Sequence, residues 1–308
     1  MADPFNRDTR VDHDRAEDLA IDASVRVRRL TCDNVSPMTF TGTQSYLVGS
    51  GDVAVIDPGP MRDGHLGRLL AALEPNERIS HIFVTHSHLD HSPGATWLAY
   101  RTGAPVLAFG PHGAGMSTVM RGLPDLGGGE GADPDFVPDR RLTDGATVAH
   151  GDWSLSALHT PGHLSNHLSF ALGDTGIVFT GDTVMGWATT LVSPPDGDMA
   201  AFMGSLARLS ERTDRVFLPG HGSAVTDPAG MLAHQTAHRK ARARQVLQAL
   251  EQGPSDPATL TRRIYTDVDP KLLPAARRNV LSTLIWMIED GKVDARGAIA
   301  SDAQFHLV

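Results

Sequence analysis

Short apolar runs alternate with amphipathic segments along the first 232 residues of the chain. Runs rich in β-branched residues and bounded by turn residues predict strands. They cover residues 25–32, 45–48, 53–57, 79–85, 105–109, 147–149, 153–159, 168–172, 177–180 and 216–218. Apolar residues at helical spacing predict helices over 66–73, 95–101 and 199–209. Strands separated by helices favour an α/β layered architecture.

The pattern changes at about Ala233. Residues 233–252 are rich in Ala, Arg and Gln and predict a long helix with no strand near it. Further helices are expected over 258–265 and 274–289, with short strands beginning at Val293 and covering 305–308. We therefore divide the chain into a polar N-terminal extension (1–24), a catalytic domain (25–232) and a small winged-helix-like domain (233–308).

Composition and charge limit the range of functions. The single cysteine, Cys32, excludes an intramolecular disulfide framework and a Cys-rich zinc site. No secretory signal is apparent, and no segment approaches the ~18 apolar residues of a membrane span, so we expect a cytoplasmic protein with no membrane partner. Residues 1–232 carry 16 basic and 28 acidic residues, a net charge of −12, whereas residues 233–308 carry 11 and 8, a net charge of +3. The mildly basic tail is weak support for a nucleic-acid partner.

The most informative motif is the run from Thr85 to His91. It follows an apolar, β-branched stretch and contains four side chains that can bind a metal, which are His86, His88, Asp90 and His91. Imidazole and carboxylate suit zinc, with iron and manganese as alternatives. A surface loop rich in histidine is the other interpretation, and later fragments of the chain argue against it.

Three later fragments repeat one arrangement, in which an apolar strand leads into a Gly-containing turn and then a His or Asp. They supply His163, Asp182 and His221. Glycine allows a sharp turn, so that the side chain points out from the edge of the sheet. Seven ligands can serve two metals, and two cations that share a water lower its pKa towards neutrality and generate hydroxide without a separate base.

These motifs, including T-H-x-H-x-D-H, resemble the metallo-β-lactamase superfamily of hydrolases over about residues 25–221. The resemblance implies an αββα sandwich with the metals at one edge of the two sheets. It also implies that His86, His88 and His163 bind one ion, that Asp90, His91 and His221 bind the second, and that Asp182 bridges both. Asp57 matches the aspartate that supports the ligands in this family, although an Asp before Pro is also typical of a simple turn.

The winged-helix-like tail contains Ile264-Tyr265 and Pro274-Ala275-Ala276-Arg277. With these residues it resembles the tail of the beta-lactamase-like protein 2 group, which includes mitochondrial endoribonucleases. The expected function is hydrolysis of a thioester or another activated ester by a dinuclear centre with a bridging hydroxide. The alternatives are cleavage of single-stranded RNA and a mononuclear-iron persulfide dioxygenase. A small-molecule substrate is the expected partner, and RNA bound through the tail is the alternative. Assembly into a homo-oligomer is left open.

Other residues near the motifs are candidates for catalysis or for shaping the site. Asp90 and His167 are the catalytic candidates, and His167 is expected either to reach substrate as a proton donor or to pack behind the ligands. The loop 193–197 is expected to line the pocket, and Met185 and Trp187 to form an apolar wall or ordinary packing. The tail arginines form either a phosphate-binding face or a solvated helix surface. They are Arg239, Arg242, Arg244, Arg262, Arg263, Arg277 and Arg278, together with Lys240.

Overall fold

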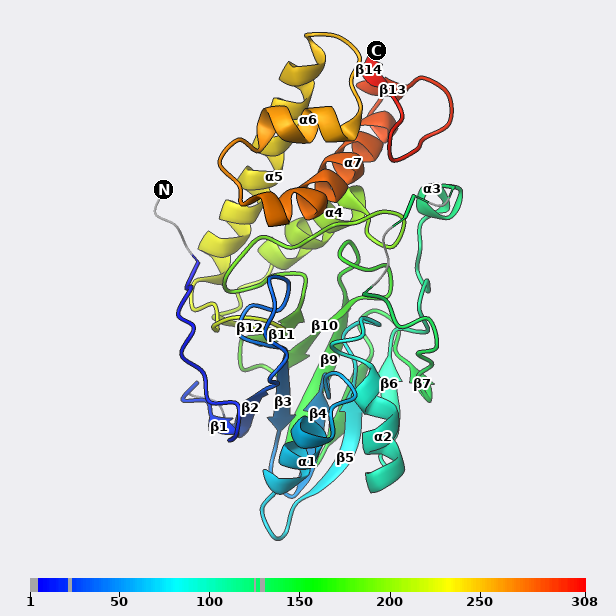
Figure 1. The fold of residues 1–308 in the computed structure, drawn as a ribbon. Coiled ribbons are helices and arrows are strands. Elements are labelled where there is room, and N and C mark those ends of the chain that lie inside the picture. The colour runs from blue at the N-terminus through cyan, green and yellow to red at the C-terminus, as the bar shows by residue number, and fades with distance from the viewer. Residues whose placement is uncertain (1–4, 22–23, 125, 128–130) are drawn as a thin grey trace.

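Two β-sheets packed face to face form the larger part of the molecule (Figure 1). The computed structural model describes residues 5–21, 24–124, 126–127 and 131–308. In spatial order, the first sheet consists of β1 (Glu17–Asp18), β2 (Val27–Thr31), β3 (Gln44–Val48), β4 (Asp52–Ile56), β5 (Arg78–Phe83), β6 (Val106–Ala108) and β7 (Arg140–Arg141). The second consists of β12 (Val216–Pro219), β11 (Ile177–Gly181), β10 (Leu168–Leu172), β9 (Trp153–His159) and β8 (Thr147–His150).

The alternation of side chains along each strand explains why the sheets pack on both faces. In β4, Ala54 and Ile56 belong to the core between the two sheets, whereas Val53 and Val55 pack towards the helices outside. Successive residues of a strand point to opposite faces, so a strand covered on both sides reads as a continuous apolar run. The same holds for β11, where Phe179 faces the inter-sheet core and Val178 the outer helices.

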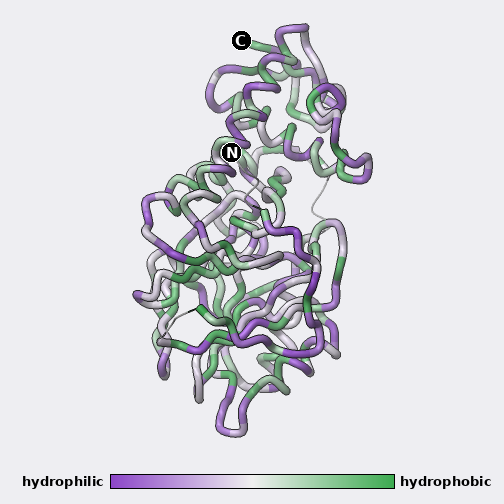
Figure 2. The backbone as a smooth tube through the Cα atoms, turned by 90° about the vertical axis from the view of Figure 1, so that its left-hand side faces the viewer, coloured by the Kyte–Doolittle hydropathy of each residue, from purple (hydrophilic) through white to green (hydrophobic). Residues whose placement is uncertain are grey.

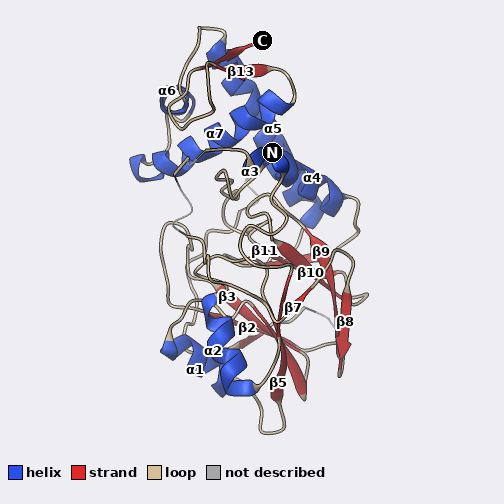
Figure 3. Cartoon of the chain, turned by 90° about the vertical axis from the view of Figure 1, so that its right-hand side faces the viewer, coloured by secondary structure: helices blue, strands red, loops and turns tan. Residues whose placement is uncertain are grey.

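Helices cover the outer face of each sheet, which confirms the predicted αββα sandwich (Figure 3). α1 (Asp63–Ala71) and α2 (Pro93–Thr102) pack against the first sheet. α4 (Met199–Ser210) and the beginning of α5 (Pro228–Leu250) pack against the second. No helix in the described part of the chain has the length and apolar character that crossing a membrane requires.

The C-terminal residues form a second lobe with its own apolar core (Figure 1). It contains the end of α5, α6 (Pro257–Ile264), a short 3-10 helix η1 (Pro270–Leu272), α7 (Leu273–Glu289) and the hairpin of β13 (Val293–Ala295) and β14 (Phe305–Leu307). The predicted helices and two-stranded wing are therefore present. Along these helices the backbone alternates between hydrophilic and hydrophobic residues, as amphipathic packing requires (Figure 2).

The helix α5 begins earlier than the change in composition suggested. Asp227 caps it by accepting the Gly230 N–H, and Pro228 occupies its first turn. Met231 packs on the second sheet, whereas Val246 lies in the core of the C-terminal lobe. A single helix thus crosses the expected boundary at residue 233 and contributes to the cores of both lobes.

Some short elements were not predicted from the sequence. β1 lies within the expected extension 1–24 and pairs with β2, where Glu17 lies 2.6 Å from Arg29. β7 is another two-residue edge strand. The long loop over 110–135 contains α3 (Thr118–Arg121), whose Met120 packs into the core of the C-terminal lobe. Residues 1–4, 22–23, 125 and 128–130 of these segments lie outside the described residues.

Candidate metal centre

The seven predicted ligands converge at one edge of the sandwich. Residues 86–91 follow β5, His163 follows β9, Asp182 follows β11 and His221 follows β12. β11 and β12 are parallel neighbours in the second sheet, so their carboxyl ends reach the same edge. A bridge between Thr43 and His221 joins this edge to the first sheet. The fold therefore brings together ligands that are up to 135 residues apart in the chain, from His86 to His221.

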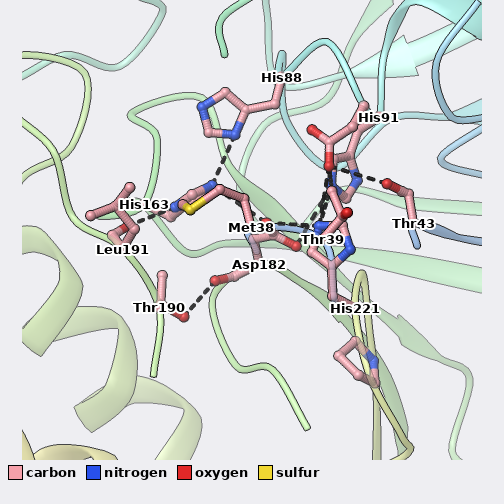
Figure 4. A network of polar contacts seen from close by, with 12 residues as sticks. Met38, Thr39, Thr43, His88, His91, His163, Asp182, Thr190, Leu191 and His221 are labelled. Carbon is pink, nitrogen blue, oxygen red and sulfur yellow. Dashed lines mark hydrogen bonds and ion pairs between the residues drawn. The ribbon is translucent and has the colours of Figure 1, made fainter. Parts of the chain in front are cut away.

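Four of these side chains form a first group. Nδ1 of His88 lies 2.9 Å from Nε2 of His163 (Figure 4). The same Nδ1 lies 3.0 Å from Nε2 of His86. Oδ2 of Asp182 lies 3.6 Å from Nε2 of His163. The candidate ligand atoms of these four residues all lie within 4.8 Å of one another, a spacing that one ion at their centre could satisfy.

The second group consists of Asp90, His91 and His221. Nε2 of His221 lies 3.2 Å from Oδ2 of Asp90 and 3.3 Å from Nε2 of His91. Asp182 also reaches this group, because its Oδ2 lies 3.4 Å from Nε2 of His221 and its Oδ1 lies 3.6 Å from Nε2 of His91. Asp182 therefore lies between the two groups, where the sequence placed a bridging carboxylate.

Glycine is required where the backbone passes closest to these ligands. A Cβ added to Gly220 would lie 2.4 Å from Oδ1 of Asp182 and 2.7 Å from Cε1 of His91. Real Cβ atoms do not approach other atoms so closely, so any side chain at position 220 would displace a ligand. The Gly in the fragment before His221 is thus explained by close packing at the centre.

Asp57 supports the second group from behind. Its Oδ1 accepts the Thr85 N–H at 2.7 Å, and its Oδ2 accepts the Thr85 Oγ1–H at 2.7 Å. The same Oδ2 lies 2.9 Å from Nδ1 of His91, and Asp57 is buried. A histidine that donates its Nδ1–H to a carboxylate presents the lone pair of Nε2 to a metal. Asp57 is therefore more than a turn residue before Pro58.

Backbone carbonyls orient two further imidazoles in the same way. Nδ1 of His163 lies 2.7 Å from the Leu191 carbonyl (Figure 4), and Nδ1 of His221 lies 3.2 Å from the Gly42 carbonyl. Each contact leaves Nε2 facing the centre of the site. The hydroxyl of Thr190 donates to the Asp182 carbonyl at 2.7 Å, so the segment around Leu191 contacts two candidate ligands.

The C-terminal lobe holds that segment. The buried guanidinium of Arg239, on α5, donates to the Thr190 carbonyl. Oδ1 of Asn279, on α7, accepts the Val192 N–H at 3.0 Å and an Arg239 N–H at 3.1 Å. Residues of the tail therefore position His163 and Asp182 indirectly, through the backbone of 190–192.

The two groups differ in their electrostatics. In the first group, burial together with neighbouring histidines lowers the pKa of His86 well below its usual range and lowers the pKa of His88 to about 3. In the second group, burial opposes protonation, but Asp182 and Asp90 outweigh it and raise the pKa of His221 to about 10. The pKa of His91 is raised for the same reason. The carboxylates thus create a strong preference for positive charge at the second group.

This arrangement fits metal ions. A neutral imidazole has one N–H and one lone pair. The ring nitrogens that face one another in this site therefore have few protons to share in hydrogen bonds. Oδ1 of Asp182 is buried and has no hydrogen-bond partner among the described residues. An orphaned buried carboxylate oxygen is costly, and a cation between the groups would satisfy it. The donor set of imidazole and carboxylate suits zinc, iron or manganese.

The surroundings of His167 favour the second of its two expected roles. This side chain is fully buried and stacks on the ring of His86, with 5.0 Å between the ring centroids. Its Nε2 accepts the Asp182 N–H at 3.1 Å, and its Nδ1 lies 3.0 Å from the hydroxyl of Thr160. Both ring nitrogens are therefore occupied, and burial lowers the pKa of His167 well below its usual range. His167 packs behind the ligands, which was the other expectation.

A pocket of about 430 Å³ opens onto the centre. Five of the seven candidate ligands line it, namely His88, Asp90, His163, Asp182 and His221. Ser193 and Asp196 also line it, as expected for the loop 193–197. The sequence did not indicate the contributions of Met38, from a loop before β3, or of Ala275 and Arg278, from α7. No local motif marks these residues, because long-range packing brings them to the pocket.

Comparison with known proteins places the chain in a family. A family model described as "Metallo-beta-lactamase superfamily" matches residues 38–221, and one described as "Beta-lactamase associated winged helix domain" matches residues 257–301. The chain is 30% identical to the "Beta-lactamase-like protein 2 homolog" of Drosophila melanogaster, over 91% of this chain and 93% of that protein.

Two further comparisons concern an enzyme and a solved structure. The "Atrochrysone carboxyl ACP thioesterase" of Aspergillus fumigatus is 32% identical over 74% of this chain and 66% of that protein. The crystal structure of a metallo-beta-lactamase family protein from Thermus thermophilus superposes with a TM-score of 0.73, at 21% identity, over 92% of this chain and 98% of that one. This likeness supports the fold.

Proposed function

This chain belongs to the metallo-beta-lactamase superfamily, and from that premise we propose that it is a dinuclear metal-dependent hydrolase of thioesters or other activated esters. The observation that carries the proposal is the position of Asp182, within 3.6 Å of imidazoles from both groups and in the wall of an open pocket. A purely structural metal site is closed by protein ligands on all sides, whereas a catalytic site leaves room for substrate.

The residues that would hold the metals follow from the two groups. His86, His88 and His163 would bind one ion, Asp90, His91 and His221 would bind the other, and Asp182 would serve both. Bound metals would supply an acidified water as nucleophile and would polarise the substrate carbonyl. Zinc is our first choice, with iron and manganese as alternatives for the same donor set.

The protein's own contribution is to orient the ligands and to exclude competing contacts. Asp57, the Leu191 carbonyl and the Gly42 carbonyl each engage Nδ1 of one histidine, so that the Nε2 atoms face the centre. Such supporting contacts typically change metal affinity by about 10–100-fold. His86 and His91 are fully buried beneath the pocket, which shields this part of the centre from solvent.

The pocket favours a substrate whose leaving group needs no proton. Among the described residues that line the pocket, Asp196 is the one carboxylate besides the candidate ligands. Its Oδ1 lies 3.3 Å from Nε2 of His112, so this carboxylate is already paired. His167, the acid that the sequence suggested, is buried with both nitrogens engaged. A thiol has a pKa of ~8.5, so it leaves readily as thiolate. The similarity to a protein named as an acyl carrier protein thioesterase supports the same substrate class.

The test combines metal analysis with turnover of a simple acyl thioester. Purified chain should contain about two metal ions and hydrolyse the thioester. His88→Ala should lose turnover and part of the bound metal, because His88 contacts both other imidazoles of its group. His13→Ala is the matched control, since His13 lies on the N-terminal segment, away from the pocket lining. One iron per chain with no hydrolysis would refute the proposal and favour the persulfide dioxygenase alternative.

Cleavage of single-stranded RNA is the second candidate, and the basic tail with its winged-helix match is the observation in its favour. Against it, several tail arginines are engaged within the tail itself. Arg277 donates to the Ser301 carbonyl at 2.6 Å, and Arg242 lies over the Tyr265 ring at 4.3 Å. RNA cleavage also expels a poor alkoxide leaving group, which requires an acid. RNA cleavage that exceeds thioester cleavage in the same preparation would favour this candidate.

A further inference from the structure

A second cavity opens beside the metal centre, and the C-terminal lobe forms one of its walls. We call it the side cavity; its volume is about 230 Å³. It shares Met38, His163, Asp182, Leu191 and Ala275 with the pocket described above. The two spaces therefore adjoin at the candidate ligands. A molecule whose reacting bond lies at the metal centre can extend from there into the side cavity.

Apolar side chains from both lobes line the side cavity. Met185 and Trp187 come from the catalytic domain, and Tyr265, Val268 and Leu272 come from the segment between α6 and α7. Apart from the Tyr265 phenol, its ionisable residues are His163 and Asp182, which belong to the metal centre. A cavity with few polar groups at its metal end and an apolar remainder is typical of a site for an apolar ligand group.

The walls of the side cavity are held in place. The Trp187 ring stacks on Phe40, with 4.8 Å between centroids and 6° between the ring planes. The Tyr265 ring packs against the guanidinium of Arg242 on its own lobe. Met38, which lies over His163 and Asp182 in Figure 4, is half exposed and has a side chain that adapts to what it contacts. The cavity thus has two firmly packed aromatic walls and one adaptable side chain, Met38.

We propose that the side cavity binds the acyl group of the substrate and thereby makes the chain selective for acyl groups of medium length; this inference rests on the hydrolase function proposed above. A thioester has an apolar acyl part and a thiol part. The larger pocket is lined by two charged side chains outside the candidate ligands, Asp196, which lies 3.3 Å from His112, and Arg278, which donates to the Ser193 hydroxyl at 2.8 Å. The side cavity has no such charged side chain among the described residues, so the apolar acyl group is the part of a thioester that suits it better. The acyl carbon would lie at the metal centre, where the two spaces meet.

The size of the side cavity sets the expected length of the acyl group. With the ~30 Å³ that a water molecule occupies in the liquid as a yardstick, 230 Å³ holds roughly seven or eight non-hydrogen atoms. That corresponds to a hexanoyl or octanoyl chain or to one aromatic ring. Burial of each methylene should raise kcat/KM about fourfold until the cavity is full.

The experiment compares acetyl, butanoyl, hexanoyl, octanoyl and hexadecanoyl thioesters of one thiol. The unaltered chain should show kcat/KM rising to about octanoyl and then levelling or falling. Ala275→Leu adds bulk on α7 where both spaces meet, so it should lower the ratio of octanoyl to acetyl turnover at least tenfold. Ala258→Leu, on α6 and outside the lining, is the matched control and should keep the ratio. Circular dichroism checks that both variants fold.

A binding measurement separates this inference from the function on which it rests. Calorimetric titration with octanoate and with acetate needs no turnover, and octanoate should bind more tightly to the unaltered chain but not to Ala275→Leu. If thioester turnover did not depend on acyl chain length and octanoate bound no more tightly than acetate, the side cavity would not be the acyl site. The proposed hydrolase function would then still stand. No turnover of any thioester, with octanoate binding as expected, would leave the cavity assigned and overturn the function. A mononucleotide that binds more tightly than octanoate and that Ala275→Leu excludes would assign the cavity to a nucleobase and overturn the proposal.

Discussion

Asp57→Asn should weaken one half of the metal centre while leaving the fold intact. In the unaltered chain, Oδ1 of Asp57 accepts the Thr85 N–H, and Oδ2 faces Nδ1 of His91 at 2.9 Å. The backbone N–H cannot become an acceptor, so the oxygen of the substituted amide must stay on that side. The amide NH₂ then faces the Nδ1–H of His91, donor against donor, and the imidazole proton moves to Nε2. A protonated Nε2 cannot bind a metal.

The size of the effect follows from the contacts that are lost. A hydrogen bond to a charged group contributes about 1.5–3 kcal/mol, which is roughly a 10–150-fold change in an equilibrium constant. Loss of a residue that supports a metal-bound histidine costs about 10–100-fold in metal affinity, in agreement with that figure. Asp57 reaches the first group indirectly, through the Thr85 hydroxyl, which lies 2.9 Å from Nδ1 of His86, so we expect the metal affinity of that group to change less than tenfold.

Metal titration of the metal-free protein tests this reasoning. Two binding steps should be resolved by calorimetry, and Asp57→Asn should weaken one of them selectively. Thioester turnover should fall in step with occupancy of that site and should recover partly when metal is in excess. Asp63→Asn, an exposed carboxylate at the start of α1, is the control and should change neither step. If Asp57→Asn bound both metals as tightly as the unaltered chain, Asp57 would not set the tautomer of His91.

Three further predictions concern the support of the centre and the stability of the fold. Arg239→Met leaves the buried Thr190 carbonyl without its hydrogen-bond donor, so the free energy of unfolding should fall by about 2 kcal/mol and metal affinity should fall with it. Urea unfolding measures the first effect and metal titration the second. If neither quantity changed, Arg239 would not support the centre. Phe202→Ala should lower the free energy of unfolding by about 3–5 kcal/mol, because this ring is fully buried between α4 and the second sheet and packs under Arg239. If urea unfolding showed a decrease below about 1 kcal/mol, this packing would be contradicted. Burial lowers the pKa of His65 from 6.5 to about 4, so the unfolded chain takes up a proton first as the pH falls. The stabilising contribution of the neutral His65 should therefore be complete above pH 6.5 and should decrease by about 3 kcal/mol between pH 6.5 and 4. In urea unfolding over the same pH interval, the free energy of unfolding of His65→Gln should decrease by about 3 kcal/mol less than that of the unaltered chain.

Local patterns predicted most strands to within a residue or two. The strand predicted over 168–172 is β10 (Leu168–Leu172), and the one over 153–159 is β9 (Trp153–His159). These strands are buried on one or both faces, so their apolar content is dictated by position in the sandwich. The edge strands β1 and β7 were missed because two exposed residues carry no such pattern. The start of α5 was missed although Asp227-Pro228 is a local signal for a helix N-terminus.

The sequence by itself determined which residues are candidate ligands of the centre, because they follow apolar strands in short motifs whose residue types and order are visible without the fold. It also identified Asp57 as a candidate support. The tertiary structure decided everything that depends on contacts between distant segments. It placed Asp182 between the two groups, buried His167 behind them, and used Arg239 and Asn279 to hold the backbone beside His163. Tertiary packing also formed the side cavity from both lobes, since a cavity is a property of surfaces that meet only after folding.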